Sequence, residues 1–259
     1  MITTIMFAAT AAEEVTKRTN WNLFSFLIDE FNLGNTQTAL YLMLAGVVLC
    51  IIIPYLIGSV NPAIILSQKI YHDDIRSHGS GNAGATNTLR TYGKKMAALI
   101  FLLDLLKAVV AVVIGSLILS REMGGAIAGI FVILGHTFPV YYKFKGGKGV
   151  ASLAGVVLIL SPISFVILIS LFVAIVLLTR FVSLGSVMCV MLLPLIQHAF
   201  YPKNGFITLA CIVFMALIVF MHRENIKRLL EGKESKISFG SKKEKAAPET
   251  KNGDNDGKS

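Results

Sequence analysis

The sequence predicts an all-α, polytopic membrane protein with about seven transmembrane helices, the N-terminus outside and the C-terminus cytoplasmic. Of its 259 residues, 54% are hydrophobic and only 15% are charged, whereas soluble domains hold about 25% charged residues. Mean hydropathy is +0.70. The apolar residues gather in long stretches with almost no charge, at lengths that match a bilayer. This pattern excludes a disordered chain and argues against an ordinary soluble enzyme.

Seven apolar segments are the expected spans. They lie at about 38–58, 96–119, 123–142, 149–160, 162–179, 183–200 and 205–221. A single helix over 150–179 would rise roughly 45 Å, well beyond a hydrocarbon core of roughly 30 Å. Because proline is favourable at the first position of a helix, we expect Ser161 and Pro162 to separate two helices. The first of these, about 149–160, is short and is alternatively a re-entrant segment.

The two ends of the chain differ from its apolar centre. Residues 1–37 are predicted to be an uncleaved N-terminal extension, because the opening apolar run is short and no basic residue precedes it. Within it, 22–32 is expected to form an amphipathic helix on the membrane surface. Residues 38–232 form the predicted seven-helix transmembrane domain. Residues 233–259, rich in lysine, acidic residues, Gly and Asn, are predicted to be a disordered cytoplasmic tail to which we assign no chemistry.

Basic residues predict the orientation. With seven spans and the N-terminus outside, the cytoplasmic loops hold Arg180 and the clusters at 69–95, 143–148 and 223–228. The outer side holds only Arg121 and Lys203 in its loops, and Lys17 and Arg18 in the N-terminal extension. Cytoplasmic loops normally carry this excess of Lys and Arg. The formal net charge of +9 therefore gives no reason to expect nucleic acid binding. Cys50, Cys189 and Cys211 lie inside apolar runs, too scattered to suggest a metal site or a disulfide framework.

The first polar motif, GSGNAGATNTLR at 79–90, combines glycines, short polar side chains and an arginine. Its candidate binding residues are Gly79, Ser80, Gly81, Asn82, Gly84, Thr86, Asn87 and Arg90. Such a segment lets backbone N–H groups and a planar cation approach an anion at a helix N-terminus. It also matches G-x-G-x-x-G, but no strand precedes it, which excludes dinucleotide binding. A glycine-rich turn with solvated polar groups is the alternative.

The second motif, KFKGGKGVAS at 143–152, leads directly into an apolar helix. Lys145, Gly146, Gly147, Lys148 and Gly149 form another phosphate-binding pattern. It is not a Walker A loop, because Gly149 follows the lysine where Ser or Thr would hold magnesium. A cluster of cytoplasmic lysines is the alternative, although it does not explain the glycines.

The third motif, HRENIKRLLEGKESK, begins at His222 where the last span ends. On a helix His222 and Asn225 share one face, with Arg228 close to it. The pair is equally compatible with a functional and a structural role. Deeper in the chain, Asp104 and Lys107 lie three residues apart in an apolar helix and are expected to form a structural ion pair, with substrate contact as the alternative. His136 is a candidate for either the core or the site.

With these blocks in view, the chain resembles the bacterial acyl-phosphate:glycerol-3-phosphate acyltransferase family. The likeness covers about residues 40–234 and includes the three motifs in this order. It also includes GSVNP at 58–62, LLDLLK at 102–107, GHTFPVY at 135–141 and RFVSLGS at 180–186. The N-terminal extension and the long tail depart from the family pattern, and Ser152 stands where threonine is common.

The resemblance implies a reaction, a location and partners. A fatty acyl group would move from acyl phosphate to the 1-hydroxyl of glycerol 3-phosphate, giving lysophosphatidic acid and phosphate, the first step of phospholipid biosynthesis. It implies no acyl carrier protein, no metal and no other cofactor, and a multi-pass protein of the bacterial plasma membrane with its active site on the cytoplasmic side, among membrane lipids.

The resemblance and the motifs together suggest site residues. Ser80, Arg90, Lys148, His222 and Asn225 are expected to be catalytic, and Ser186 and Arg228 join the glycine loops as substrate-binding residues. Acyl phosphate is already activated, so the hydroxyl is expected to attack it directly, with either His222 or a substrate phosphate oxygen as base. A transporter of phosphorylated solutes is the rival class. Such a protein would place charges near the midplane and often shows repeated halves. In this sequence only Asp104 and Lys107 lie deep in a span, and no internal repeat is evident.

Overall fold

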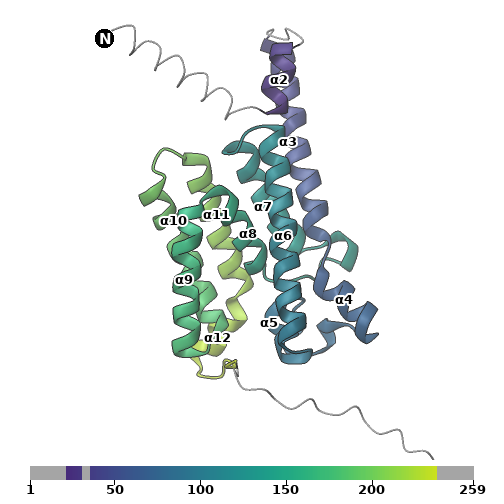
Figure 1. Ribbon diagram of the computed structural model, residues 1–259, viewed down its shortest axis with the longest axis vertical. Helices are drawn as coiled ribbons and strands as arrows, with labels where there is room; N and C mark the ends of the chain where they lie inside the picture. Colours follow the sequence, from purple (N-terminus) through teal and green to yellow (C-terminus); the bar gives the residue numbers. More distant parts are fainter. Residues whose placement is uncertain (1–21, 31–35, 238–259) are drawn as a thin grey trace, which may run out of the picture.

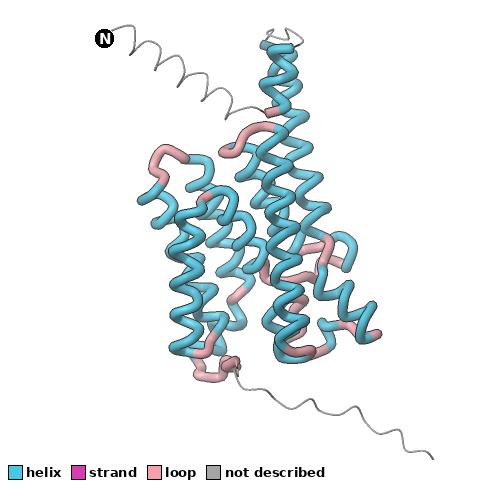
Figure 2. The backbone as a smooth tube through the Cα atoms, viewed as in Figure 1, coloured by secondary structure: helices cyan, strands magenta, loops and turns pink. Residues whose placement is uncertain are grey.

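The computed structural model describes residues 22–30 and 36–237, and this part of the chain is entirely helical apart from its loops (Figures 1 and 2). In chain order the α-helices are α2 (Leu23–Glu30), α3 (Thr36–Ser59), α4 (Pro62–Tyr71), α5 (Ala85–Thr91), α6 (Lys94–Ile118), α7 (Met123–Thr137), α8 (Val150–Leu160), α9 (Pro162–Thr179), α10 (Val182–Phe200), α11 (Gly205–Met221) and α12 (Arg223–Leu230). Two 3-10 helices, η1 (Ile75–Ser77) and η2 (Val140–Tyr142), lie in the polar connections.

The apolar helices pack side by side as an elongated bundle (Figure 1). One group is formed by α3, α6 and α7, and a second by α9, α10 and α11. The short helix α8 packs against α6, α7 and α9, and α7 contacts α11, so these contacts join the two groups. Helix α2 lies at one end of the bundle, whereas α5, α12 and the last described residues lie at the other (Figure 1).

Each of the seven predicted apolar segments is a helix, but their lengths differ. Within residues 22–30 and 36–237, five segments are long and apolar enough to cross a bilayer, namely 37–71, 94–118, 123–142, 162–179 and 182–200. A sixth results if α11 and α12, which meet at a bend of 60°, are one span. Helix α8 has 11 residues and rises only about 16 Å, roughly half of the hydrocarbon thickness. The number seven and the orientation therefore stay predictions.

The predicted break at Ser161 and Pro162 is confirmed. Helix α8 ends at Leu160, and Pro162 is the first residue of α9. At the N-terminal side, the predicted amphipathic helix corresponds to α2, although residues 31 and 32 of the predicted segment lie outside the described residues. The rest of the extension, 1–21, and the tail after residue 237 also lie outside them.

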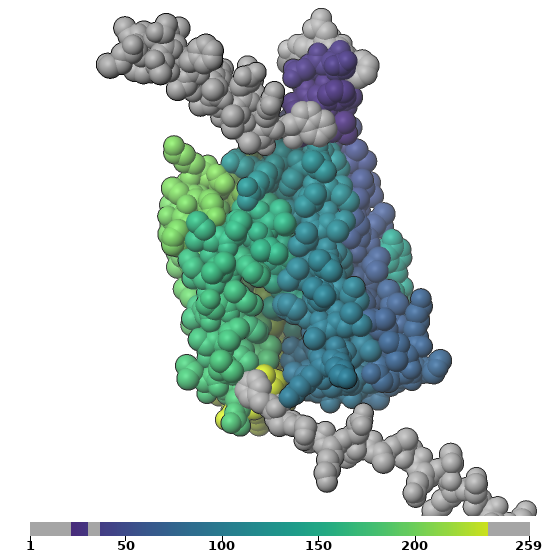
Figure 3. Space-filling model, viewed as in Figure 1, coloured from purple at the N-terminus to yellow at the C-terminus, as the bar shows by residue number. Residues whose placement is uncertain are grey.

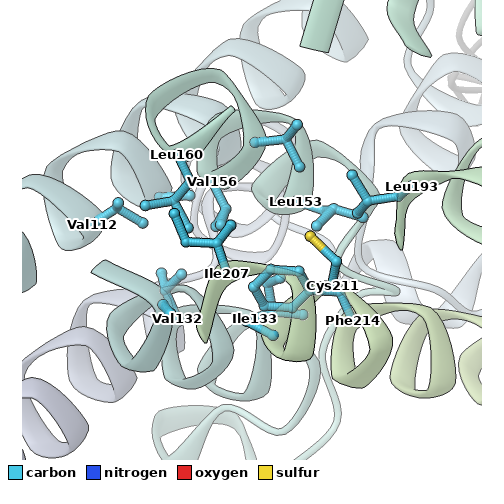
Figure 4. Close-up of a cluster of buried hydrophobic side chains, with 14 of the residues drawn as sticks. Val112, Val132, Ile133, Leu153, Val156, Leu160, Leu193, Ile207, Cys211 and Phe214 are labelled. Atoms are coloured by element: carbon cyan, nitrogen blue, oxygen red, sulfur yellow. The ribbon is translucent and has the colours of Figure 1, made fainter. Parts of the chain in front are cut away.

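The buried core of the bundle consists mainly of aliphatic side chains, with Cys211 and Phe214 among them. Val132, Val156 and Phe214 are almost fully buried within it (Figure 4). Helices α3 and α7 approach so closely that a Cβ at Gly58 would collide with the Val132 carbonyl, and one at Gly135 with the Tyr55 carbonyl. Small residues permit this backbone contact between membrane helices, where packing drives association.

Candidate active site

The two glycine-rich loops are in direct contact. The Arg76 guanidinium, just before the first loop, donates hydrogen bonds from Nη1 to the carbonyl oxygens of Tyr142 (3.1 Å) and Lys145 (3.2 Å) in the second. A Cβ at Gly147 would lie 2.7 Å from the Ala83 carbonyl oxygen of the first loop. The structure therefore brings together two motifs that are about 60 residues apart in sequence.

The first loop is shaped by Asn87, which is buried. Its Nδ2 donates to the carbonyl oxygens of Ile75 and His78, both at 3.0 Å, and its Oδ1 accepts from the Ser80 N–H at 3.0 Å. Gly79 has φ +55°, and a Cβ there would collide with Asn87 Oδ1. Asn87 thus supports the loop, and its predicted contact with substrate stays a prediction.

The other residues of the first motif surround this support. Gly81 takes φ +70°, Gly84 precedes α5, and the Ser80 side chain is exposed at the loop. Asn82 and Thr86 are half-buried beside it. Arg90, near the end of α5, is exposed and donates from Nη2 to the Ser235 carbonyl oxygen at 3.2 Å. The first motif therefore also contacts the end of the third.

The second loop is held against the end of α7. The N–H groups of Gly146 and Gly147 donate to the carbonyl oxygens of Thr137 and His136, each at 3.1 Å. A Cβ at Gly147 would also collide with Nε2 of His136. Gly149, at φ +82°, turns the chain into α8. The glycines are thus needed for close packing. Lys145 is exposed, whereas the half-buried Lys148 side chain lies among the residues of the third motif.

The centre of the site is a chain of polar contacts that starts at Lys148. Its ammonium donates to Oδ1 of Asn225, whose Nδ2 donates to Oε1 of Glu234 at 2.7 Å. Ser183, on α10, donates its hydroxyl to the same carboxylate oxygen at 2.9 Å, and Nε of Arg228 donates to Oε2 at 2.7 Å. Asn225, Ser183 and Glu234 are all buried, so the second loop, α10, α12 and the chain after α12 meet in one network.

The charges of this network act on one another. Burial, followed by the positive charge of Arg228, lowers the pKa of Lys148 to about 8; Arg90 adds to this effect, and Glu234 opposes it. Burial would raise the pKa of Glu234, but hydrogen bonds from Asn225, Arg228 and Ser183 hold it below its ordinary value. Three cations thus stand against one carboxylate, an arrangement suited to a dianion.

His222 lies at the corner between α11 and α12, and only 3% of it is exposed. Its Nδ1 lies 2.8 Å from the Ile218 carbonyl oxygen. Because a carbonyl only accepts, Nδ1 carries the proton in the neutral ring, and Nε2 is left as an acceptor. His222 is also close enough for its charge to be influenced by Lys148 and Glu234. The geometry therefore joins His222 to the site.

A buried ion pair between Asp104 and Lys107 lies next to the second loop. Lys107 Nζ lies 2.8 Å from Asp104 Oδ1, so the predicted pair is confirmed. The same ammonium donates to the carbonyl oxygens of Gly58 (3.1 Å) and Val60 (2.7 Å) and lies 3.0 Å from Nδ1 of His136. His136 is thus a buried member of this group, and its other edge faces Gly147.

An apolar cavity of about 90 Å³ lies between α6, α8, α9, α10 and α11. Val150, two residues after Lys148, and Ile218, whose carbonyl binds His222, belong to its lining, so it begins next to the polar network. Ser186 also lines it, and its hydroxyl donates to the Val182 carbonyl at 3.0 Å. The remaining lining residues are Phe101, Leu153, Ala154, Val157, Phe165, Leu168, Ile169, Phe172, Cys189, Val190 and Leu193.

Two residues of the network were missed by the sequence analysis. Ser183 stands in the RFVSLGS block, three residues before Ser186 and on the same helix face, which is a usable signal. Glu234 lies at the start of the segment predicted to be a disordered tail without assigned chemistry, but the structure places its carboxylate in this network. Gly232, at φ +69°, ends α12 and lets the Glu234 N–H bond back to the Arg228 carbonyl at 3.1 Å. A lone carboxylate in a basic tail gives no comparable signal.

The chain is similar to known proteins over most of its length. The family model for glycerol-3-phosphate acyltransferase matches residues 48–232. The glycerol-3-phosphate acyltransferase of Thermoanaerobacter pseudethanolicus is 46% identical over 190 residues, which cover 73% of this chain and 95% of that protein. The one from Bacillus subtilis is 35% identical over 193 residues, which cover 74% and 98%.

A solved structure is also similar. The crystal structure of PlsY, an integral membrane glycerol 3-phosphate acyltransferase in its glycerol 3-phosphate form, superposes with a TM-score of 0.68 at 37% identity. The match covers 74% of this chain and 96% of that one. Since the family model matches residues 48–232, well over half of the chain, and these relatives are 35% and 46% identical over about three-quarters of it, the chain belongs to the glycerol-3-phosphate acyltransferase family of integral membrane proteins.

Proposed function

We propose that the protein transfers a fatty acyl group from an acyl phosphate to the 1-hydroxyl of glycerol 3-phosphate, releasing lysophosphatidic acid and inorganic phosphate. The observation that carries this proposal is the network around Lys148. Lys148, Arg90 and Arg228 present three cations to one buried carboxylate. The two excess positive charges match a phosphate that carries about two negative charges near neutral pH. Both substrates of the proposed reaction bring such a group.

The apolar cavity supports a fatty acyl donor. It starts beside Val150 and Ile218, next to Lys148 and His222, and is lined by apolar side chains apart from Ser186 and Cys189. An acyl chain in this cavity would keep its reactive carbonyl close to the polar network while its methylene groups stay out of water. A volume of about 90 Å³ holds only a few methylene groups, so the rest of the chain would lie along the lipid.

The chemistry follows from the activated donor. The glycerol 1-oxygen attacks the acyl carbonyl carbon, the new C–O bond forms, and the C–O bond to phosphate breaks, with the electron pair leaving on the phosphate. Lys148 and Arg90 would hold the leaving phosphate and stabilise its charge. Asn225 would orient Lys148, Arg228 would add to the field, and the exposed Ser80 hydroxyl would donate to a phosphate oxygen at the loop.

The proton of the attacking hydroxyl has two candidate acceptors. Nε2 of His222 is left without a proton by the bond from Nδ1 to Ile218, which suits a base. A phosphate oxygen of the substrate is the other. Neither acceptor requires a covalent acyl-enzyme, a metal or another cofactor. We further propose that the site faces the cytoplasm of a bacterial plasma membrane and that acyl carrier protein is not required.

The test is a transfer assay with the purified full-length protein in detergent. It is incubated with palmitoyl phosphate and labelled glycerol 3-phosphate, and both labelled lysophosphatidic acid and released phosphate are measured. We expect the two products in equal amounts. Parallel reactions with palmitoyl-CoA or with palmitoyl-acyl carrier protein as the donor should give no product. Product from either of these, with none from acyl phosphate, would refute the proposed donor, and trapping of an acyl-enzyme would refute direct transfer.

A further inference from the structure

Glu234 is an unusual residue for the place it occupies. It follows the last helix in a lysine-rich segment, yet only 3% of its side chain is exposed. Its two carboxylate oxygens accept hydrogen bonds from three side chains on two helices, namely Ser183 on α10 and Asn225 and Arg228 on α12. Yellow atoms of the last described residues lie between the two halves of the bundle at the lower end of one face (Figure 3).

The segment that carries Glu234 is anchored on both sides. Its start is tied to α12 by the bonds of the Lys233 and Glu234 N–H groups to the Arg228 carbonyl. Beyond it, the Ser235 carbonyl accepts from Arg90, and the Ile237 N–H donates to the Arg180 carbonyl at 2.9 Å. The carboxylate is therefore held at a defined place among the cations.

Glu234 and Lys148 together determine which way the Asn225 amide points. Because a carboxylate only accepts, Nδ2 of Asn225 must face Glu234, and Oδ1 must then face the Lys148 ammonium. A neutral amide at position 234 could pair with either end of Asn225, so the Lys148 ammonium alone would then hold the orientation. The carboxylate also reduces the positive charge around Lys148, which faces Arg90 on α5, His222 at the α11–α12 corner and Arg228 on α12.

On the basis of the proposed function, we infer that Glu234 is a positioning residue of the acyl-transfer site, whose carboxylate orients Asn225 and keeps Lys148 charged to receive phosphate. It acts through these two side chains and touches neither substrate. With Glu234 in place, the network has two positive charges in excess; without it, three cations would crowd together, and the one that is most buried, Lys148, would lose its proton more easily.

The decisive variant is Glu234→Gln, and its matched control is Glu231→Gln. Glu231 lies three residues earlier, is exposed, and pairs only with Lys233 at 3.1 Å among the described residues, so the control removes the same charge outside the network. Both full-length proteins are reductively methylated with ¹³C-formaldehyde, and the Lys148 signal, assigned from Lys148→Arg, is titrated by NMR. This readout does not depend on turnover.

We expect Glu234→Gln to move the Lys148 titration to lower pH by roughly half a unit or more, while Glu231→Gln leaves it in place. In the transfer assay, Glu234→Gln should raise KM for glycerol 3-phosphate about fivefold or more and shift the alkaline fall of kcat/KM to lower pH. Glu234→Asp, which retains the charge, should restore the pH profile in part. An unchanged titration and an unchanged pH profile in a folded Glu234→Gln protein would overturn the inference.

Ser183→Ala covers the case in which Glu234→Gln does not fold. It removes one donor to the carboxylate and no charge, so KM should rise about threefold with the pH profile unchanged; wild-type KM and kcat would overturn the inference. The proposed function is judged separately. If the wild-type protein transfers no acyl group but the Lys148 titration shifts in Glu234→Gln, the reaction is refuted and the positioning role stands. If the wild-type protein is active but the Lys148 titration and the pH profile of Glu234→Gln are unchanged, the positioning role is refuted and the reaction stands.

Discussion

The Lys148 ammonium is hydrogen-bonded to Oδ1 of Asn225, although the two residues are 77 positions apart in the sequence. Lys148 ends the second glycine loop just before α8, and Asn225 lies in the first turn of α12. This contact joins the loop that approaches the apolar cavity to the helix that leaves the bundle. Its loss should therefore affect catalysis more than folding.

Lys148→Ala should abolish transfer while the protein is still extracted and monodisperse in detergent. The matched control is Lys143→Asn in the same loop, because Lys143 is exposed and asparagine tolerates its left-handed backbone. It should retain near-normal turnover. Size-exclusion chromatography and the transfer assay check both variants, and turnover by Lys148→Ala close to the wild-type rate would remove Lys148 from the site.

The rate should also depend on pH through Lys148. Burial, then the charge of Arg228, lowers its pKa to about 8, so the ammonium is present below that pH and is lost as the pH rises through it. We expect kcat/KM for glycerol 3-phosphate to fall above pH 8. Lys148→Arg keeps a charge at all these values, so its residual activity should be flat between pH 7 and about 9. An alkaline fall that persists in this variant would point to another group.

Arg90→Ala should lower kcat/KM by about 100-fold or more, because a planar cation on the leaving phosphate is lost. The side chain is exposed, and it donates one hydrogen bond to the carbonyl of Ser235, so the thermal stability should change little. Lys95→Ala, an exposed charge at the start of α6, is the control and should behave as the wild type. Steady-state kinetics and Tm separate the two effects, and near-normal turnover of Arg90→Ala would contradict the assignment.

Gly147→Ala should remove most of the activity and lower Tm. The new methyl group would collide with His136 Nε2 and lie 2.7 Å from the Ala83 carbonyl oxygen, so the two glycine loops would be forced apart. Gly205→Ala is the control, because a Cβ there meets nothing within 4 Å and its φ is not positive. This control should keep full activity, and its Tm should be equal to or higher than that of the wild type. Equal Tm and turnover for the two variants would show that the loop contact is dispensable.

Ala154→Leu should make the protein prefer shorter donors. Ala154 lines the apolar cavity of about 90 Å³, and a leucine side chain would fill most of it. We expect kcat/KM to fall about tenfold with palmitoyl phosphate and much less with octanoyl phosphate. Ala174→Leu, on the exposed face of α9, adds the same volume outside the cavity and should leave the preference unchanged. An equal loss with both donors would argue against an acyl site in this cavity.

Much of the local structure was predictable because it depends on local chemistry. Runs of apolar residues long enough for a bilayer gave α3, α6, α7, α9, α10 and α11, and proline after Ser161 placed the start of α9. The ion pair of Asp104 and Lys107 followed from their spacing on one helix. In contrast, α8 was also predicted as a span, but its 11 residues are too few to cross the hydrocarbon core. The number of apolar segments therefore does not fix the number of spans.

The amino-acid sequence alone determined the membrane class, the helices and the three polar motifs, because chain length, hydrophobicity and glycine-rich phosphate chemistry are readable within a few residues. Only the folded structure decided that Asn87 supports its loop, that His136 joins the buried ion pair, and that Glu234 and Ser183 enter the cationic network. These roles arise from contacts between distant segments. A side chain's neighbours across the bundle, and hence its charge and hydrogen bonds, leave no pattern in the residues beside it.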